Sequence, residues 1–294
     1  MLLAACLLIG FLGADPGAGI PSAALPDSDT YDVPTTRFSI GTVRSQDPQQ
    51  VLLDLINGER RKAGLKLLQW DARMAEAARG HAEIMSQQGK LSHQFAGEPD
   101  LLERLSEKNV RLDAASENVV YDVTAEGAHD AFDHSPRHWQ NMMNASYDSV
   151  GIAVVNLEGI LYVVEDFAHR IIDVSDADAA RRVASHVADL RRQVGLPALE
   201  MVSDSHVQDF VNQMALRETP DSHGPLSLPG ARLAASYATT NPDEIPASVA
   251  RIASVRGTSA CAVGVRFART ERYPSGLFWV SIVVFDSTPS LARK

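Results

Sequence analysis

The stretch LINGERRKAGLKLLQWDARMAEAARGHAEIM, residues 55–85, contains two helix signals with a short break between them. The first signal ends in Arg60-Arg61-Lys62 and then Gly64, and cationic residues in a last turn before a glycine are typical of a helix end. Asp71 is suited to capping the second helix, whose apolar residues keep to one face until Gly89. The stretch therefore predicts two consecutive helices, each with one buried face.

Downstream of these helices, the chain changes from helical to strand-like patterns. A short helical segment is predicted around residues 101–105, and β-branched runs follow at residues 150–155 and 160–167. The two runs flank Leu157-Glu158-Gly159, which predicts a β-hairpin. Helices first and a hairpin last predict an α+β fold in which helices cover a sheet.

The same order of signals recurs in the second half of the chain. LINGERRKAGLKLL, residues 55–68, aligns with HVADLRRQVGLPAL, residues 186–199, and the two glycines lie 131 positions apart. Two more pairs of blocks follow in the same order, Ser92-His93 with Ser222-His223 and Val150-Gly151-Ile152 with Val263-Gly264-Val265. This order predicts two tandem copies of one domain. A single α/β domain with a chance echo is the alternative.

The first residues, MLLAACLLIGFLGA, are apolar and lead into small residues, as in the leader of an exported protein. They have no Lys or Arg before the apolar core, and cleavage after Ala14 or Ala24 fits the preference for small residues. Leu3-Ala4-Ala5-Cys6 also resembles a lipobox, so a lipid anchor at Cys6 is an alternative and the only membrane attachment that we expect. We therefore expect a secreted or periplasmic, extracytoplasmic protein.

Composition limits the partners of the chain. Its 294 residues are 45% hydrophobic, as in folded proteins, and carry a net charge of −10, which argues against nucleic acid as a partner. Cys261 is the thiol that remains after the leader is removed, and its apolar neighbours predict a buried side chain and not a nucleophile. Together the patterns divide the chain into a signal peptide (1–24), a linker (25–47), a first domain (48–169), a junction (170–182) and a second domain (183–288).

Five stretches of the first half share a family pattern. In order they are residues 55–85, quoted above, LSH (91–93), SENV (116–119), HSPRHWQNMMNASYDSVGIAV (134–154) and YVVEDFA (162–168). Together they resemble the CAP superfamily, which includes cysteine-rich secretory proteins, venom antigen 5 and pathogenesis-related proteins, and above all its short bacterial forms. The resemblance implies a three-layer α-β-α sandwich.

The resemblance also implies a pocket lined by two histidines and one or two acidic residues. Carried over to this sequence, these positions are His93, Glu117 and His138. The second acidic position of many eukaryotic members falls on His134, which departs from the pattern. The second half keeps His223 at the first position but reads Ala-Ala-Ser-Tyr-Ala around the acidic one, so we expect a degenerate CAP-like copy there.

The chemistry of these side chains leaves more than one role open. Two neutral imidazoles and a carboxylate can hold zinc or a similar divalent ion with open positions, so His93, His138 and Glu117 are the expected metal set. The same three side chains could support acid–base chemistry on a water, which makes them the candidate catalytic residues. We expect them, together with His134, to contact a ligand. The structural alternative is that His93 and Glu117 bond to each other and tie a loop to the sheet.

Four further residues near these positions are expected to have structural roles. Ser135-Pro136 predicts the start of a helix that holds His138 in its first turn. His81 is expected to pack along its helix, with contact to the site as the lesser alternative, and Glu98 is expected to be a solvated surface group.

Three functions compete. We favour a binding module for a small apolar, lipid-like or envelope-derived ligand, because lipid binding recurs in the family that the sequence resembles. A metal-dependent, peptidase-like hydrolase is the alternative, although the chain lacks Gly-x-Ser-x-Gly and His-Glu-x-x-His motifs and we lean away from an enzyme. A structural or interaction module without chemistry is the third.

Overall fold

The structure is a computed structural model that describes residues 5–9, 31–32 and 47–286. The chain divides into two compact units, and the boundary between Arg170 and Ile171 falls within the predicted junction. The described residues up to Arg170 form the first unit, and those from Ile171 onward form the second unit. Each unit is described by itself.

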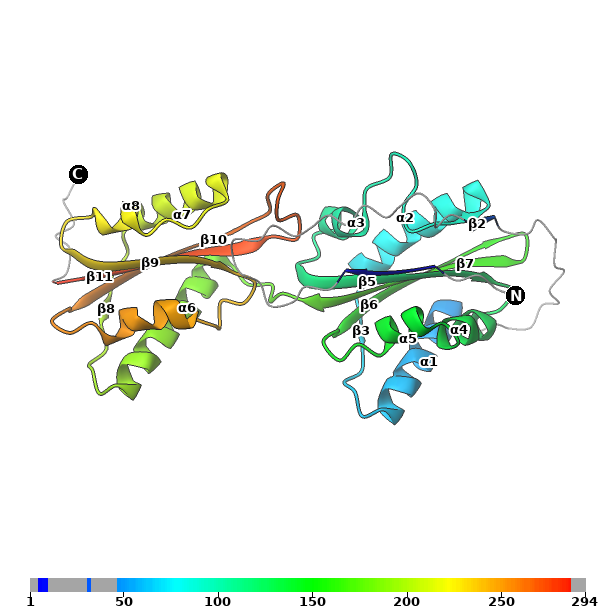
Figure 1. The fold of residues 1–294 in the computed structure, drawn as a ribbon, viewed down its shortest axis with the longest axis horizontal. Helices are drawn as coiled ribbons and strands as arrows, with labels where there is room; N and C mark the ends of the chain where they lie inside the picture. Colours follow the sequence, from blue (N-terminus) through cyan, green and yellow to red (C-terminus); the bar gives the residue numbers. More distant parts are fainter. Residues whose placement is uncertain (1–4, 10–30, 33–46, 287–294) are drawn as a thin grey trace. The chain divides into compact units, whose positions relative to one another are not determined.

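The first unit combines helices with one main sheet (Figure 1). Its helices are α1 (Pro48–Lys62), α2 (Ala72–Gln88), α3 (Leu101–Glu107), α4 (Ala125–Asp133) and α5 (Pro136–Met142). Its strands are β1 (Ala5–Ile9), β2 (Tyr31–Asp32), β3 (Gln69–Trp70), β4 (Lys90–Leu91), β5 (Leu112–Asp122), β6 (Ser149–Leu157) and β7 (Ile160–Arg170).

The main sheet of the first unit has the strand order β1-β5-β7-β6-β3. The central strand β7 is antiparallel to both β5 and β6, β1 is antiparallel to β5, and β3 is parallel to β6. Strand β2 pairs with β4 in a separate two-stranded sheet. In Figure 1, α2 and α3 lie on one face of the main sheet and α1, α4 and α5 lie on the other. The predicted α+β sandwich is confirmed.

Each face of this sheet has its own apolar cluster. Met85 of α2 belongs to the cluster on one face together with Val119, and Ile56 of α1 belongs to the cluster on the other face together with Val120. Successive residues of a strand point to opposite faces. Glu117 therefore points to the α2 side of the sheet, whereas Asn118 points to the side of α1, α4 and α5.

Local signals set the elements that carry the candidate site. The Asp71 side chain caps α2 by accepting bonds from two backbone N–H groups, and α2 ends at Gly89, whose φ of 63° is left-handed. The hairpin between β6 and β7 turns at Glu158 and Gly159, both with positive φ. The predicted cap, helix end and hairpin are confirmed.

The second unit also combines helices with a sheet. Its helices are α6 (Asp176–Gln193), α7 (Ser205–Arg217), α8 (His223–Leu226), α9 (Ala247–Ala250) and the 3₁₀ helix η2 (Arg251–Ser254). Its strands are β8 (Glu200–Met201), β9 (Ala231–Thr239), β10 (Ala260–Ala268) and β11 (Leu277–Phe285). Helix α6 begins inside the predicted junction, so the second unit starts earlier than residue 183.

The sheet of the second unit has the order β8-β10-β11-β9. Strand β11 is antiparallel to β9 and β10, and β8 is parallel to β10. The order and directions therefore match β3-β6-β7-β5 of the first unit. The duplication of one domain stays a prediction, and this shared strand order supports it.

A buried arginine near the end of the first helix recurs in both units. Arg60 Nε donates to the carbonyl of Lys66 at 2.8 Å, and Arg191 Nε donates to the carbonyl of Pro197 at 2.8 Å. Both guanidinium groups also bond carbonyls of a later loop, those of Met142, Asn144 and Tyr147 for Arg60 and of Ala253 and Val255 for Arg191. Each arginine thus ties its helix to the loop that precedes the hairpin strands.

Candidate functional site

The candidate site in the first unit lies on the α2 side of strand β5. Glu117 comes from the middle of β5, and His93 comes from the loop after β4. Helix α3 adds Arg104, and α2 adds His81. All four side chains are buried, with Glu117 and His81 at 0% exposure.

Glu117 is the centre of the cluster. Its Oε1 lies 2.8 Å from Nδ1 of His93 and 3.9 Å from Nε2 of His81. Its Oε2 accepts a short bond from the Arg104 guanidinium. A buried carboxylate is costly unless it is paired, and here a guanidinium and an imidazole N–H pair with it. The prediction that His93 and Glu117 meet is confirmed.

Two neighbours of Glu117 differ from their predicted roles. The ring of His81 lies 2.7 Å from Glu98 Oε1 through Nδ1 and 2.7 Å from the Ser92 carbonyl through Nε2. Glu98 is 8% exposed and also accepts a bond from the Phe95 backbone N–H. The prediction that Glu98 is a solvated surface group is therefore wrong, because the loop after β4 turns its carboxylate inward onto α2. His81 likewise belongs to the cluster, and does not only pack along its helix.

The pKa values of Glu117 and of its cross-strand partner shift in opposite directions. Burial acts to raise the pKa of Glu117, but Arg104 and the histidines outweigh it, so the pKa falls to about 2. Asp166 of β7 lies directly opposite Glu117 in the sheet. Burial, and next the charge of Glu117, raise the pKa of Asp166 well above its ordinary value. The surroundings therefore favour the ionised form of Glu117 and the protonated form of Asp166.

His93 presents one free ring nitrogen to the interior. The Glu117 carboxylate accepts from Nδ1–H of His93, and in the neutral ring this arrangement leaves the lone pair on Nε2. Nε2 of His93 is buried and has no hydrogen-bond partner among the described residues. An unsatisfied buried polar atom is rare and calls for an explanation, and a ligand with a donor group would satisfy it.

His138 lies on the other side of β5. It is in the first turn of α5, after the predicted Ser135-Pro136 start, and its side chain is buried. Its backbone carbonyl accepts from Asn118 at 3.3 Å, and its ring packs edge-on against Phe132 at 5.1 Å between centroids. Because Asn118 and Glu117 point to opposite faces, the structure places His138 beside a different polar group from His93.

The polar group beside His138 is a second buried network. Asn141 of α5 donates to Asn118 at 2.8 Å, and Asn118 donates to Glu165 of β7 at 3.3 Å. Burial raises the pKa of Glu165 to about 8, although the bond from Asn118 opposes the shift. Glu165 is therefore mostly protonated at neutral pH, which avoids an unpaired buried charge.

His134 does not reach either network. Helix α4 runs on to Asp133, which makes His134 the capping residue after it. The ring bonds back to the Asp130 carbonyl at 2.8 Å, and the side chain is 74% exposed. His134 thus lies at the surface, and its contact with a ligand stays a prediction.

The fit of a divalent metal can be tested on these donors. Within residues 5–9, 31–32 and 47–286, no three His, Cys, Asp or Glu side chains are placed to hold one ion. Nδ1 of His93 and both oxygens of Glu117 are engaged within the cluster. The described residues thus show no preformed set of metal ligands at this cluster, and we derive no step through a metal. Zinc binding by His93, His138 and Glu117 stays a prediction.

The comparison with protein-family models decides the nature of the first unit. Residues 53–167 match the model of the cysteine-rich secretory protein family, CAP. The first unit contains a CAP domain. A relative from Bacillus subtilis, the uncharacterized membrane protein YlbC, is 35% identical over 36% of this chain and 31% of its own length. A second from Bacillus subtilis, the uncharacterized protein YkwD, is 26% identical over 48% of this chain and 58% of its own length.

The chain thus spans less than two thirds of either curated relative. Among solved structures, it is similar to an extracellular protein with an SCP domain from Bacillus anthracis, with 26% identity, 42% and 40% of the two chains covered and a TM-score of 0.40. It is also similar to an outer surface protein from Borrelia burgdorferi, with 18% identity, 44% and 96% covered and a TM-score of 0.41.

Two residues of the CAP-domain cluster were missed by sequence reasoning. Arg104 lies in Leu-Leu-Glu-Arg-Leu, where its spacing from Leu101 and Leu105 puts it on the buried face of α3, and this spacing was the available signal. Asp166 follows Glu165 inside a β-branched apolar run. Two adjacent acids in a strand that is buried on both faces were the second signal.

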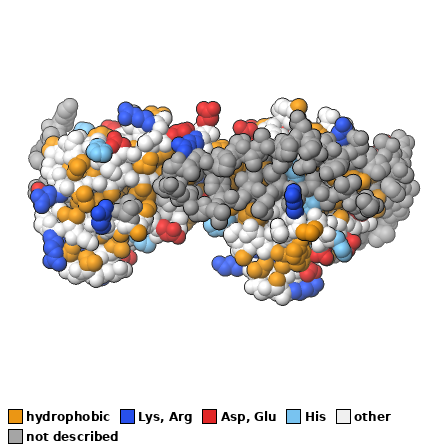
Figure 2. Space-filling view, viewed as in Figure 1, with side chains coloured by type: hydrophobic (Ala, Val, Ile, Leu, Met, Phe, Trp, Pro, Cys, Tyr) orange, Lys and Arg blue, Asp and Glu red, His pale blue; other side chains and the backbone are white. Residues whose placement is uncertain are grey.

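The surface charge is mixed on the face shown in Figure 2. The described Lys and Arg side chains there are scattered among acidic and neutral ones. This face has no continuous basic stripe among its described residues. Among the described residues, moreover, there is no helix with the length and apolar character needed to cross a membrane.

The positions that match Glu117 and Asp166 are serines in the second unit. Asp166 is paired with Glu117 and Gly151 on its two sides, and Ser281 is paired with Ser236 and Gly264. The two serine hydroxyls bond to each other at 3.1 Å. His223, which aligns with His93, has a fully exposed side chain. The second unit therefore keeps the sheet but not the buried ionic cluster.

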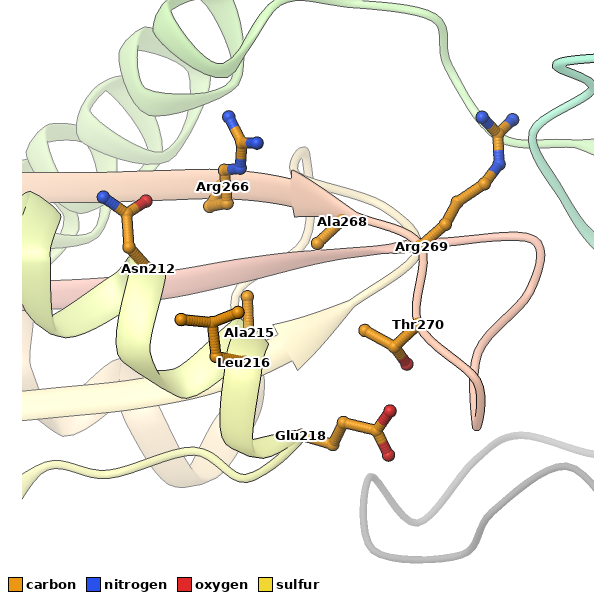
Figure 3. Close-up of a pocket in the computed structure, with 8 residues that line it drawn as sticks. All are labelled: Asn212, Ala215, Leu216, Glu218, Arg266, Ala268, Arg269 and Thr270. Atoms are coloured by element: carbon orange, nitrogen blue, oxygen red, sulfur yellow. The ribbon is translucent and has the colours of Figure 1, made fainter.

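The second unit has a pocket of its own with a volume of about 640 Å³ (Figure 3). It lies where the end of α7 meets the end of β10, and Leu216, 77% exposed, lies at its wall. The lining residues are Asn212, Ala215, Leu216, Glu218, Arg266, Ala268, Arg269 and Thr270. None of the predicted site residues lines it.

Proposed function

We propose that the CAP domain is an extracytoplasmic binding module for a small apolar, lipid-like or envelope-derived ligand. The observation that carries the proposal is the buried, unpartnered Nε2 of His93, held in one tautomer by Glu117 and Arg104. In this proposal a donor group of the ligand bonds Nε2, and the apolar remainder of the ligand lies along the cluster.

The second unit supports a functional origin for this cluster. Burying an ion pair with additional histidines contributes little net stability and is often replaceable by neutral packing. The second unit has the same strand order but only a serine pair at the corresponding positions. The sheet can thus form without the cluster, and perturbed buried carboxyls gather at functional sites.

A metal-dependent, peptidase-like hydrolase is the second candidate. The observation in its favour is the Glu117–Asp166 pair beside His93, in which the surroundings favour the ionised form of Glu117 and the protonated form of Asp166. Such a pair can accept and donate a proton in hydrolysis. A module without chemistry is the third candidate, and it requires that neither ligand nor metal depends on His93.

The direct test is titration of the protein with a fluorescent fatty acid. The variant His93→Asn keeps an N–H at the Nδ1 position for Glu117 but removes the Nε2 lone pair, and His223→Asn is the matched control on an exposed ring. We expect binding to weaken about tenfold in His93→Asn, as for one lost hydrogen bond to a buried group, and to be unchanged in the control. Equal affinity in both variants would overturn the proposal.

Two further measurements test which unit binds the ligand and whether the first unit binds zinc. Leu216→Asp changes the pocket of Figure 3, so loss of fatty-acid binding in that variant alone would place the ligand in the second unit. Calorimetric titration with zinc, beside the variant with His93 and His138 both changed to Ala, tests the hydrolase. One-site binding that is lost in the variant favours the hydrolase, and no binding in either protein excludes this metal set.

A further inference from the structure

Strand β5, which carries Glu117 of the candidate cluster, has among the described residues only the short strand β1 on its outer side. The inner edge of β5 pairs with β7 along nearly its whole length. Its outer edge pairs antiparallel with β1, and the register joins Ala5–Ile9 to Ala115–Val119. Leu7 lies opposite Glu117, so this added strand is centred on the cluster. Helix α5, which carries His138, also lies beside β1.

The segment that holds this edge belongs to the predicted leader. All of β1 lies within residues 1–24, the segment that we expect to be cleaved. Removal of the leader would leave the outer N–H and C=O groups of Ala115–Val119 without a strand partner. An unpaired edge is a template for another extended chain. The same edge in the second unit, β9, has no outer strand among the described residues, but it also has no cluster beside it.

The chemistry of the occupant follows from the edge and from β1. A strand edge offers alternating donors and acceptors, which a polypeptide backbone can satisfy and a hydrocarbon chain cannot. The sequence of β1 is Ala-Cys-Leu-Leu-Ile, which is apolar throughout. An occupant of this edge therefore needs an extended backbone and apolar side chains, and it needs no charge.

We propose that the outer edge of β5, from Ala115 to Val119, binds an extended apolar polypeptide segment by antiparallel strand addition once the leader is removed. This inference goes beyond the proposed binding function, because its ligand is a polypeptide at the strand edge and not the small ligand at Nε2 of His93. In the uncleaved chain, β1 occupies the edge in place of the ligand. Because β1 is tethered, it competes at a high effective concentration.

The test uses the chain that starts at Leu25 and a labelled peptide with the sequence of β1, with Cys6 replaced by Ser and lysines added outside the strand. The two described apolar clusters on the faces of the main sheet are built from residues 51–167, so this chain keeps both, and circular dichroism checks its fold. We expect saturable binding by fluorescence anisotropy. The full chain should bind at least about tenfold more weakly, because β1 competes in cis.

Two N-methylated peptides distinguish strand addition from apolar adhesion. One is methylated at the residues matching Cys6 and Leu8, and the other at those matching Ala5, Leu7 and Ile9. Alternate N–H groups of a strand face opposite edges, so only one peptide should lose affinity, by about tenfold or more for two or three blocked bonds. Equal affinity of the two peptides, or no binding by the chain from Leu25, would overturn the inference.

The two proposals fail separately. If the fatty acid binds in a His93-dependent way but the peptide does not bind, the strand-addition inference is wrong and the binding function stands. If neither probe binds, both are wrong. Peptide binding that is weakened by only one of the two methylation patterns supports the inference. If His93→Asn also weakens that binding, both proposals are supported.

Discussion

The two sheets of this chain share a strand order and differ in what is buried between two equivalent strands. In the first unit, Glu117 and Asp166 face each other across β5 and β7, with Arg104 paired to the carboxylate. In the second unit, Ser236 and Ser281 face each other across β9 and β11. The frame around these positions is alike, down to a buried arginine and a close-packed glycine in each unit.

This difference distinguishes the sheet, which both units form, from the buried ionic cluster, which only the first unit has at these positions. The second unit forms its sheet around a neutral hydroxyl pair, which costs little to bury when bonded. The first unit buries an ion pair, two further histidines and two more acids near the same strand. Burial of so many ionisable groups is not required by the sheet, and such groups gather at functional sites.

The largest expected effect comes from breaking the ion pair on one side only. Arg104→Met leaves the Glu117 charge buried without its main partner, and we expect a loss of about 3–5 kcal/mol in the free energy of unfolding of the first unit. Adding Glu117→Gln removes the stranded charge and should recover most of that loss.

Hydrogen exchange with urea reports the two units separately through peptides of β5 and β7 and peptides of β9 and β11. The second unit is thus an internal control. If the double variant were as unstable as Arg104→Met, the carboxylate would not be the group that Arg104 stabilises.

The next effect concerns the glycine that faces the second helix of each unit. A Cβ on Gly151 would lie 2.2 Å from backbone atoms of Met74 and Ala75, whereas one on Gly264 would lie 3.0 Å from its nearest atoms at Val207 and Val211. We expect Gly151→Ala to destabilise its unit by about 3 kcal/mol and Gly264→Ala by about 1 kcal/mol. Thermal unfolding, monitored by hydrogen exchange in peptides of each unit, shows which variant is destabilised more. A larger loss of stability in Gly264→Ala would contradict the packing argument.

A pH effect distinguishes the first unit through Glu165. Its pKa is raised from 4.5 to about 8, so between these values the folded state holds a proton that the unfolded state has lost. The stability due to this group is therefore greatest at low pH and falls as pH rises. We expect wild type to lose about 2–3 kcal/mol relative to Glu165→Gln between about pH 5.5 and pH 7.5.

The matched control is Glu126→Gln, which removes one exposed acid from α4. Urea unfolding at several pH values gives the slopes. A wild type that runs parallel to Glu165→Gln over this range would show that Glu165 is ionised in the folded protein.

Sequence reasoning reached the parts of this structure that local rules decide. The cap at Asp71, the helix end at Gly89 and the hairpin at Glu158 each depend on a few adjacent residues. The meeting of His93 and Glu117 came from the family resemblance, which contains tertiary information that a single pattern lacks.

The parts that were missed depend on how distant segments pack. The sequence around Glu98 is typical of a surface acid, but the loop after β4 places its carboxylate against His81. Asp166 becomes important only because the strand register sets it opposite Glu117. The exposure of His134 depends on the end of α4, where its ring bonds back to the Asp130 carbonyl.

The smallest expected effect lies at the serine pair of the second unit. Ser281→Ala removes one side of a neutral hydrogen bond of 3.1 Å, and we expect a cost of about 0.5–1.5 kcal/mol. Changing Ser236 to Ala as well should cost little more, because no buried hydroxyl is then left unpaired. Exchange in peptides of β9 and β11 measures both variants, with β5 and β7 as the control. A cost near that of Arg104→Met would mean that the second unit also depends on the polar pair between these strands. The sheet would then require a polar pair in both units, and the contrast between the two units would fail.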